Sequence, residues 1–339
     1  MPKKIFKTVR LHSNENPLGP SPIALEAIRK YSQDIHCYAD WVPKRLKEKL
    51  ARKQQVAPEN IAVSAGSYEL IDLIIHFLVT ADEEILTFNN TFMAYSYGAK
   101  RNGRKCVVAQ MPAPECNLKD LIPLCGNKTK VIFFANPNNP TGTIVTHDSL
   151  RDLLETIPSN VLVVADEAYY EYVTDKSYPD SVRLQKEFPN LVILRTFSKI
   201  YGLAGVRIGY GIASENLVKK LEEKRLLRSI NMLGEKAAEA ALDDLEYIRH
   251  SVRHNSRERD YLFNELTQLG FAVNKSQANF LYLPFDNDEG KNKVFTTLAD
   301  DGLIVCDLAI FGHEKSLRIS VGKKDVNQRI IDCLRQISI

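Results

Sequence analysis

Residues 131–142 read VIFFANPNNPTG, a short apolar run followed at once by a loop with two prolines and three asparagines. A continuous apolar run of this length is typical of a strand that is buried on both faces of a parallel sheet. The prolines fix φ, so the loop is a rigid frame in which Asn139 can offer a fixed donor to a ligand oxygen. The stretch therefore predicts a buried strand that ends at a preorganised polar loop.

The same strand-and-turn pattern recurs over the first two thirds of the chain, where short β-rich runs alternate with helix-length segments. The runs are Ile61–Ser64, Glu84–Phe88, Lys105–Ala109, Val131–Ala135, Val161–Ala165, Leu191–Arg195 and Val206–Gly211. This alternation predicts an α/β domain with a mostly parallel seven-stranded sheet that is covered by helices on both faces. Ligands of such sheets bind beyond the carboxyl ends of the strands, so the turns after these runs are the candidate site.

The pattern changes at both ends of the chain. Residues 11–22 hold three prolines and a glycine, which is typical of an extended arm. Around the predicted sheet we expect helices at about Pro22–Tyr31, Lys44–Lys53, Tyr68–Val79, Glu215–Ser229, Leu233–Leu242 and Leu245–Leu269. Short strands and a terminal helix should follow, with strands at Phe271–Asn274, Asn279–Pro284, Ile304–Asp307 and Leu317–Val321.

These segments predict three parts. They are an N-terminal arm (residues 1–35) that packs with the small domain, a large domain (36–235) and a smaller α+β domain (236–339). A length of 339 residues agrees with about two domains.

Charge and composition exclude several classes of protein. Lys and Arg number 45 against 42 Asp and Glu, and a net charge of +3 favours neither nucleic acid nor an anionic membrane as partner. No apolar run approaches the ~18 residues of a membrane helix, and the basic N-terminus lacks the apolar segment of a signal peptide. The six cysteines have no C-x-x-C spacing, which favours free thiols. We therefore expect a soluble cytoplasmic protein.

A metal site is not expected. His250 and His254 stand at i,i+4, but they lie in a dense charge run, residues 249–260, that is typical of a solvated helix face.

Two further turns carry groups suited to a charged ligand. Gly66 and Ser67 precede a helix, where free backbone N–H groups bind anions, although an ordinary βα turn can also carry a glycine. Asp166 leaves an apolar strand and must be paired if it is buried. A cationic ring nitrogen would be such a partner, and an N-cap is the alternative.

Lys199 follows Thr196 and Ser198 at the end of another predicted strand. A sheltered lysine can lose its proton and attack a carbonyl, whereas a lone surface lysine would have no such role. The two hydroxyls and Arg207, eight residues after the lysine, are suitable phosphate donors. Together with the other turns, these residues suit a cofactor that has a phosphate, an aldehyde and a pyridine nitrogen.

With these motifs in this order, the sequence resembles the fold-type I pyridoxal-phosphate aminotransferases and, among them, the histidinol-phosphate aminotransferase family. The matching stretches span nearly the whole chain and are residues 14–20 (NENPLGP), 136–142, 166–169 (DEAY), 196–207 (TFSKIYGLAGVR) and 317–322 (LRISVG). The resemblance implies an aspartate-aminotransferase-like large domain, a homodimer, and pyridoxal 5′-phosphate as cofactor. It also implies ping-pong transamination, in which an amine donor gives its amino group to a 2-oxo acid such as 2-oxoglutarate. Histidinol phosphate is the first candidate for the donor.

The resemblance further implies roles for single residues at the cofactor. Lys199 would hold the cofactor covalently and move protons, and Asp166 would pair with the ring N–H. Tyr169 and Asn139 would bond the phenolic oxygen of the ring, and Phe92 would stack on its face.

Other implied roles concern the phosphate and the substrate. The cofactor phosphate would be held by Gly66, Ser67, Thr196, Ser198 and Arg207. Tyr38 would reach that phosphate across the dimer interface. Arg318 would grip the anionic end of the substrate bidentately, with Asn16 beside it.

One position departs from the family pattern. The family usually has an arginine where this chain has Cys306, and that arginine would help to bind the substrate phosphate. Losing one charge-assisted bond costs about 1.5–3 kcal/mol, or about 10–150-fold in affinity. Arg228, Lys315 or Lys323 could compensate.

Other functions stay open beside transamination of histidinol phosphate. The donor could be an aromatic amino acid or another amino-phosphate, and an amino-acid-phosphate decarboxylase would use the same fold and lysine. A regulator with this fold would need an N-terminal DNA-binding domain, for which about 35 residues leave no room. A nicotinamide dehydrogenase lacks support because no predicted strand is followed by G-x-G-x-x-G.

Overall fold

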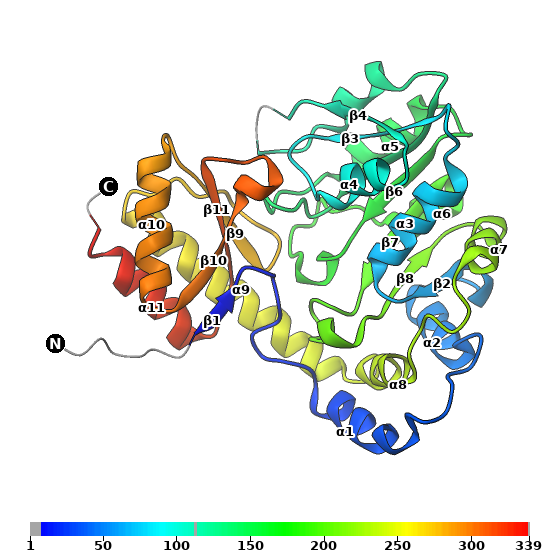
Figure 1. Cartoon of the computed structure of the whole chain (residues 1–339), viewed down its shortest axis with the longest axis horizontal. Coiled ribbons are helices and arrows are strands. Elements are labelled where there is room, and N and C mark those ends of the chain that lie inside the picture. The colour runs from blue at the N-terminus through cyan, green and yellow to red at the C-terminus, as the bar shows by residue number, and fades with distance from the viewer. Residues whose placement is uncertain (1–7, 112–113, 338–339) are drawn as a thin grey trace.

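The computed structural model describes residues 8–111 and 114–337, which form two sheets that lie side by side, each with its own helices (Figure 1). Most of the basic N-terminal segment, residues 1–7, lies outside the described residues. The long helix α9 (Leu245–Gln268) runs from α8 (Met232–Ala241) to the smaller sheet.

The larger sheet has seven strands in the order β2-β8-β7-β6-β5-β3-β4. Their bounds are β2 Ile61–Ser64, β3 Glu84–Phe88, β4 Lys105–Ala109, β5 Thr129–Ala135, β6 Leu162–Asp166, β7 Leu191–Thr196 and β8 Gly209–Ile212. Strands β4, β3, β5, β6 and β7 are parallel, and β8 is antiparallel to both β7 and β2. The predicted mostly parallel, seven-stranded α/β sheet is confirmed.

Two apolar layers cover this sheet because successive side chains of a strand point to opposite faces. On β5, Ile132 and Phe134 belong to one buried cluster, and Val131 and Phe133 belong to the other. The first cluster includes residues of α2 (Lys44–Gln54), α5 (His147–Thr156), α6 (Ser181–Glu187) and α8. The second includes residues of α3 (Ser67–Leu78), α4 (Ala94–Arg101) and α7 (Glu215–Lys224). The strand ends are therefore held between two packed layers.

The smaller sheet has four strands in the order β1-β10-β11-β9. Their bounds are β1 Val9–Leu11, β10 Leu303–Asp307, β11 Ser316–Ser320 and β9 Phe280–Pro284. Helices α9, α10 (Asp288–Asp300) and α11 (Lys324–Leu334) supply the rest of its apolar core. Strand β1 is parallel to β10, so the start of the arm pairs with a strand that is more than 290 residues away in the sequence.

Three local predictions are wrong. Phe271–Asn274 is no strand, because Gly270 takes a left-handed φ of 90° and the Phe271 N–H donates back to Leu266 at the end of α9. Strand β8 begins at Gly209, three residues after the predicted start at Val206. Ala204–Val206 forms a 3-10 turn instead, and Arg207 has a left-handed φ of 51°. Helix α7 ends at Lys224, where the extended backbone of Arg225 replaces the predicted continuation to Ser229. The arm segment Val9–Leu11 is a strand that we did not predict.

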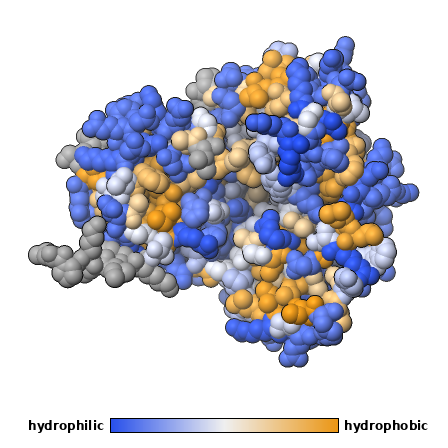
Figure 2. Space-filling model, viewed as in Figure 1, coloured by the Kyte–Doolittle hydropathy of each residue, from blue (hydrophilic) through white to orange (hydrophobic). Residues whose placement is uncertain are grey.

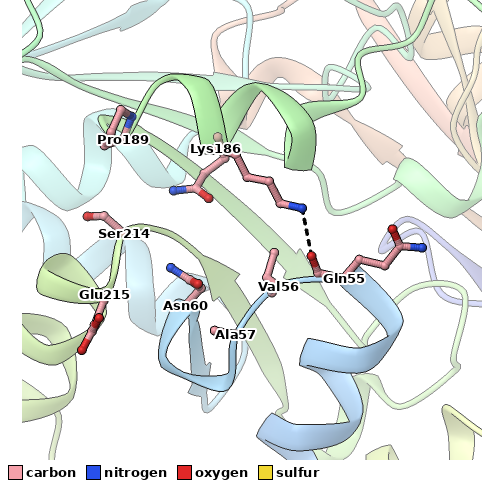
Figure 3. Close-up of a pocket in the computed structure, with 9 residues that line it drawn as sticks. Gln55, Val56, Ala57, Asn60, Lys186, Pro189, Ser214 and Glu215 are labelled. Atoms are coloured by element: carbon pink, nitrogen blue, oxygen red, sulfur yellow. Dashed lines mark hydrogen bonds between the residues drawn. The ribbon is translucent and has the colours of Figure 1, made fainter.

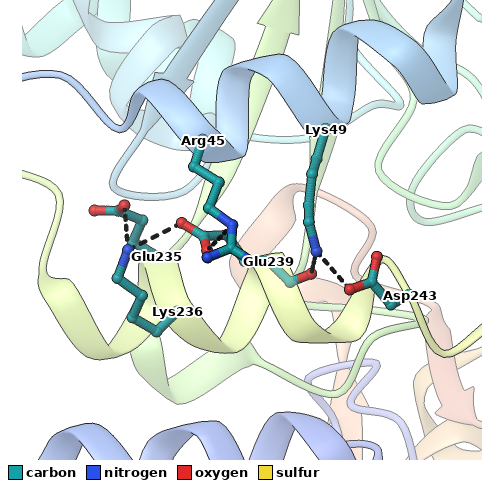
Figure 4. Close-up of polar contacts among 6 residues, drawn as sticks. All are labelled: Arg45, Lys49, Glu235, Lys236, Glu239 and Asp243. Atoms are coloured by element: carbon teal, nitrogen blue, oxygen red, sulfur yellow. Dashed lines mark hydrogen bonds and ion pairs between the residues drawn. The ribbon is translucent and has the colours of Figure 1, made fainter.

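Helix α8 is fixed between α1 (Pro22–Tyr31) and α2, and a set of ion pairs joins it to α2 (Figure 4). Glu235 and Glu239 are both buried, and Lys236 lies between them at 3.0 and 3.1 Å from their carboxylates. Arg45 and Lys49 of α2 reach the same helix through the Glu239 carboxylate and the Glu239 carbonyl. These charges are mutually paired, which offsets part of the cost of burying the two carboxylates.

Candidate active site

A cavity of about 470 Å³ lies at the carboxyl ends of β5, β6 and β7, between the larger sheet and the smaller one. Ten of the residues predicted for the site line it. They are Ser67, Phe92, Asn139, Asp166, Tyr169, Thr196, Ser198, Lys199, Arg207 and Arg318. The parallel strands explain this convergence, because their carboxyl ends meet at one edge of the sheet.

Lys199 lies in the loop after β7, within reach of the arm. Its Nζ donates to the Ser13 carbonyl at 2.9 Å and lies 5.4 Å from the centre of the Tyr169 ring. The arm approaches this loop so closely at Gly202 that a Cβ there would lie 2.2 Å from the Gly19 carbonyl oxygen. Glycine at position 202 therefore lets the arm close over the lysine.

Asp166 ends β6 and is 4% exposed, and the two oxygens of its carboxylate have different surroundings. Oδ2 accepts the Tyr95 hydroxyl at 3.0 Å, while Oδ1 is buried without a hydrogen-bond partner. Burial raises the pKa of Asp166 to about 6, and the Tyr95 hydroxyl and the Ala168 N–H oppose that rise. The N-cap alternative does not hold, because the next α-helix, α6, starts at Ser181 and is capped by Asp180.

The unpartnered Asp166 Oδ1 fits a cationic ring nitrogen. A buried carboxylate oxygen without a donor is costly, and an N⁺–H group in the cavity would satisfy it.

Tyr169 and Asn139 both line the cavity and are held by different segments. The Tyr169 hydroxyl accepts a hydrogen bond from Asn14 Nδ2 at 3.0 Å. Asn139 Oδ1 accepts a hydrogen bond from Arg318, whose guanidinium also donates to the His12 carbonyl at 2.6 Å. Arg318 is 5% exposed and its Nε is buried without a partner, so it has a donor left for an anion.

Gly66, Ser198, Thr196 and Arg207 form a cradle of donors. A Cβ at Gly66 would lie 2.5 Å from Arg207 Nη2, so only glycine leaves the guanidinium in place. Arg207 donates to the Ala204 carbonyl at 2.7 Å, and Thr196 Oγ1 donates to Ser198 Oγ at 3.0 Å. With the N-terminus of α3 beside them, two hydroxyls and a guanidinium suit a phosphate.

Two predicted site residues lie elsewhere. The Asn16 side chain donates to the Ile200 carbonyl at 2.7 Å and does not line the cavity, whereas Asn14, two residues earlier, does. Tyr38 is 84% exposed and lies away from this chain's own cavity. A role for Tyr38 at the site requires a second subunit.

The structure adds residues that the sequence did not single out. His12, Ser13, Asn14, Tyr68, Ala168 and Phe311 also line the cavity. Tyr95, buried behind the cavity wall, lies on α4, which starts two residues after Phe92, and no sequence pattern marked it as a partner of Asp166. The arm and Phe311 reach the cavity only through pairing in the smaller sheet, so no local pattern marks them.

Cys306 lies beside Arg318, its partner in the register of β10 and β11, and both side chains line the cavity. Burial raises the pKa of the Cys306 thiol, so it is neutral at pH 7. None of Arg228, Lys315 and Lys323 lines the cavity of this subunit.

A second cavity of about 510 Å³ lies across the larger sheet's far end, between residues 55–60, Lys186 and Ser214 (Figure 3). It is open to solvent. Lys186 Nζ donates a hydrogen bond to the Gln55 carbonyl at 2.9 Å. Its lining includes Lys186 and Glu215 among small, apolar and amide side chains, and it has no grouping comparable to that around Lys199.

The described ranges, 8–111 and 114–337, contain no helix long and apolar enough to cross a membrane. Within the same residues there is no grouping of three or more His, Cys, Asp or Glu side chains that could hold a metal ion.

Comparison with known proteins agrees with this geometry. Residues 7–334 match the family model for aminotransferase class I and II. The histidinol-phosphate aminotransferase of Anaeromyxobacter sp. is 40% identical over 98% of this chain and 92% of its own length. That of Moorella thermoacetica is 37% identical over 97% of this chain and 85% of its own.

Solved structures show the same fold. The histidinol-phosphate aminotransferase of Sinorhizobium meliloti, in complex with pyridoxal-5′-phosphate, has a TM-score of 0.88 at 26% identity, covering 98% of this chain and 92% of that one. That of Clostridium acetobutylicum has a TM-score of 0.88 at 25% identity, covering 97% and 98%. The aspartate aminotransferase of Thermus thermophilus, at 19% identity, shows the fold alone. The chain belongs to the class I and II aminotransferases and, among them, to the histidinol-phosphate aminotransferase family.

Proposed function

We propose that this chain is a pyridoxal-5′-phosphate-dependent aminotransferase that moves the amino group of histidinol phosphate to 2-oxoglutarate in amino-acid biosynthesis. The observation that carries the proposal is the cavity at the strand ends. It joins a lysine, a buried unpartnered carboxylate oxygen and a phosphate cradle, which match the aldehyde, ring nitrogen and phosphate of that cofactor. The relatives' names support the donor.

The residues of the cavity fit the cofactor group by group. Lys199 would hold the aldehyde carbon, and Asp166 Oδ1 would accept the ring N–H. Tyr169 and Asn139 would bond the phenolic oxygen, and Phe92 would cover one face of the ring. The phosphate would lie in the cradle of Gly66, Ser67, Thr196, Ser198 and Arg207. Bound pyridoxal phosphate supplies an electron sink that stabilises negative charge at the substrate's α-carbon.

The chain's own groups would then position and move protons. The amine of Lys199, once free, would take the proton from the substrate carbon and return it at the cofactor side, as a general base and acid. Asp166, as a carboxylate, would keep the ring nitrogen protonated. The arm, whose Ser13 carbonyl accepts from Lys199, would limit the entry of water.

A homodimer completes the proposal. Six large apolar side chains are exposed on two segments near α2 and after α7, and they are Ile35, Tyr38, Trp41, Val42, Leu226 and Leu227. Figure 2 shows apolar side chains on the face over α1 and α8. Exposed apolar residues gathered on neighbouring segments mark protein contacts. Tyr38 would cross this interface to the partner's cofactor phosphate.

Arg228 would lie beside Tyr38 at the same interface. Its guanidinium lies 4.3 Å from the centre of the Tyr38 ring and 5.4 Å from that of Trp41. If Tyr38 enters the partner's site, Arg228 enters beside it and supplies the cation that Cys306 does not. Of the three compensating residues predicted, Arg228 is therefore the one we favour.

We also propose that the protein is cytoplasmic. All six cysteines are free, as is usual in a reducing compartment.

The test is a single-turnover experiment on the cofactor-loaded protein. Histidinol phosphate, glutamate, aromatic amino acids and other amino-phosphates are mixed with it separately, and the cofactor absorbance is followed to its amine form. Conversion that is fastest with histidinol phosphate supports the proposal. Slow conversion with histidinol phosphate and fast conversion with another donor contradicts it, and release of carbon dioxide would identify a decarboxylase.

A further inference from the structure

Tyr95 is a fully buried residue of α4 that lies behind the cavity rather than in its lining. Its ring stacks on Phe133 of β5, with centroids 5.0 Å apart and planes 13° apart. Phe92 meets the ring edge-on at 5.8 Å. Two aromatic contacts therefore hold the Tyr95 hydroxyl in one direction.

That direction is toward Asp166. The hydroxyl donates to Oδ2 at 3.0 Å, and it leaves Oδ1 as the only oxygen of the carboxylate without a partner. A carboxylate has two equivalent oxygens, so a fixed donor to one of them determines where the other points. The pKa of Tyr95 lies well above its usual range because of burial, so the hydroxyl keeps its proton and remains the donor.

The same bond influences the charge of Asp166. Burial is the main cause that raises its pKa, to about 6, and the Tyr95 hydroxyl is the first cause that lowers it. The Ala168 N–H and Lys199 act in the same direction as Tyr95, and Glu167 acts against them. Without the phenol, Asp166 would take up a proton at a higher pH than it does now.

We propose that Tyr95 is a positioning residue for the cofactor, because its hydroxyl orients the Asp166 carboxylate with Oδ1 toward the ring nitrogen. The same hydrogen bond favours the ionised carboxylate. Tyr95 acts through Asp166 and touches neither substrate nor cofactor. The inference concerns the cofactor half of the site, so it holds whichever amine is the donor.

The test uses Tyr95→Phe, which keeps the ring on Phe133 and removes only the hydroxyl. Tyr172→Phe is the matched control, because Tyr172 is also buried and its hydroxyl has no hydrogen-bond partner. Cofactor-free protein is titrated calorimetrically from pH 5 to 8.5 with pyridoxamine 5′-phosphate, which has the ring and phosphate but no aldehyde for Lys199. Inorganic phosphate is the second probe, since it reports the cradle alone.

In the wild type, affinity for pyridoxamine phosphate should fall as Asp166 is protonated below about pH 6. In Tyr95→Phe the midpoint of that fall should rise by about one pH unit, the shift that corresponds to about 1.4 kcal/mol. Tyr172→Phe should keep the wild-type midpoint, and phosphate affinity should be the same in all three proteins.

An unchanged midpoint in Tyr95→Phe would overturn the proposal. So would an equal loss of affinity for both probes at every pH, which would mean that the ring and hydroxyl are only structural. If Tyr95→Phe does not fold, Phe133→Leu loosens the stacking while the hydroxyl stays, and a smaller upward shift is expected. A wild type that binds phosphate but not pyridoxamine phosphate would overturn the cofactor assignment and this inference together.

Discussion

The two halves of the cavity are built in different ways. On the half formed by the larger sheet, Asp166 and Thr196 end β6 and β7, and Lys199 follows β7, so neighbours in the sheet become neighbours in the site. On the other half, the arm at residues 12–14 meets Arg318, about 300 residues later in the sequence, through the smaller sheet. The proposed cofactor site is therefore a property of one sheet edge, whereas the proposed donor site depends on how three distant segments pack.

Asn14 forms hydrogen bonds with residues of both halves of the cavity. Its side chain donates to the Tyr169 hydroxyl, and its backbone N–H donates to Ser320 Oγ at 2.9 Å. Its carbonyl accepts from Asn279 at 3.0 Å, and its φ of 53° is left-handed. Asparagine tolerates that conformation better than most residues, which accounts for its use at this junction.

The largest effect should come from Lys199→Ala on the sheet half. Without its amine we expect transamination to fall by at least about 10³-fold, because both the covalent attachment and the proton transfer are lost. Steady-state rates with histidinol phosphate and 2-oxoglutarate measure this. Lys176→Ala, at an exposed loop lysine, is the control and should keep its rate. A Lys199→Ala rate near that of the wild type would contradict the assignment.

Gly66→Ala should disrupt the cradle, and it also strains the backbone because Gly66 has a left-handed φ of 87°. The new Cβ would displace the Arg207 guanidinium, so affinity for inorganic phosphate should fall by about tenfold or more, the value of one charge-assisted bond. Calorimetric titration of cofactor-free protein measures it. Gly103→Ala is the control, since Gly103 also has a positive φ, of 63°, and a Cβ there meets no atom within 4 Å. Equal phosphate affinity in both variants would place the phosphate elsewhere.

Arg228→Ala should affect the donor half only. If the arginine reaches the partner's substrate phosphate, KM for histidinol phosphate should rise about tenfold, while KM for 2-oxoglutarate and the cofactor affinity stay constant. Arg253→Ala, on the charged face of α9, serves as control. A parallel rise of KM for both substrates would indicate a general loss of dimer rather than a specific contact.

Ser320→Ala should give the smallest effect, because it removes one hydroxyl at the junction. The hydroxyl accepts from the Asn14 N–H and donates to Asn14 Oδ1, so two neutral hydrogen bonds are lost. At about 0.5 kcal/mol each, we expect kcat to fall about fivefold. Cofactor affinity should fall less than kcat, because the hydroxyl acts on the proposed cofactor site only through Asn14 and Tyr169, and Asp166 and the cradle keep all their contacts. A loss of cofactor affinity as large as the loss of kcat would show that the halves are not separable.

Sequence alone predicted the sheet half well because its information is local. Each strand could be read from an apolar run, and the residue after it is carried to the sheet edge by the strand itself. Gly66, Asn139, Asp166 and Lys199 were therefore identified before their neighbours in space were known.

The donor half could not be predicted to the same degree. The pairing of Val9–Leu11 with Leu303–Val305 has no local pattern, and it decides that Asn14 rather than Asn16 faces the cavity. The failed strand at Phe271–Asn274 has a local cause instead, because the left-handed Gly270 and the hydrogen bond from the Phe271 N–H to the Leu266 carbonyl end α9 there. The roles that we propose for Tyr38 and Arg228 require a second subunit, which the sequence pattern of one chain does not place.

The most direct test of the central claim is to locate the residue that holds the cofactor. The protein is loaded with pyridoxal 5′-phosphate, treated with borohydride to make the bond permanent, digested and mapped by mass spectrometry. The account predicts one labelled peptide, with the label on Lys199. A label on any other lysine, or none at all, would contradict a cofactor site at this edge of the sheet.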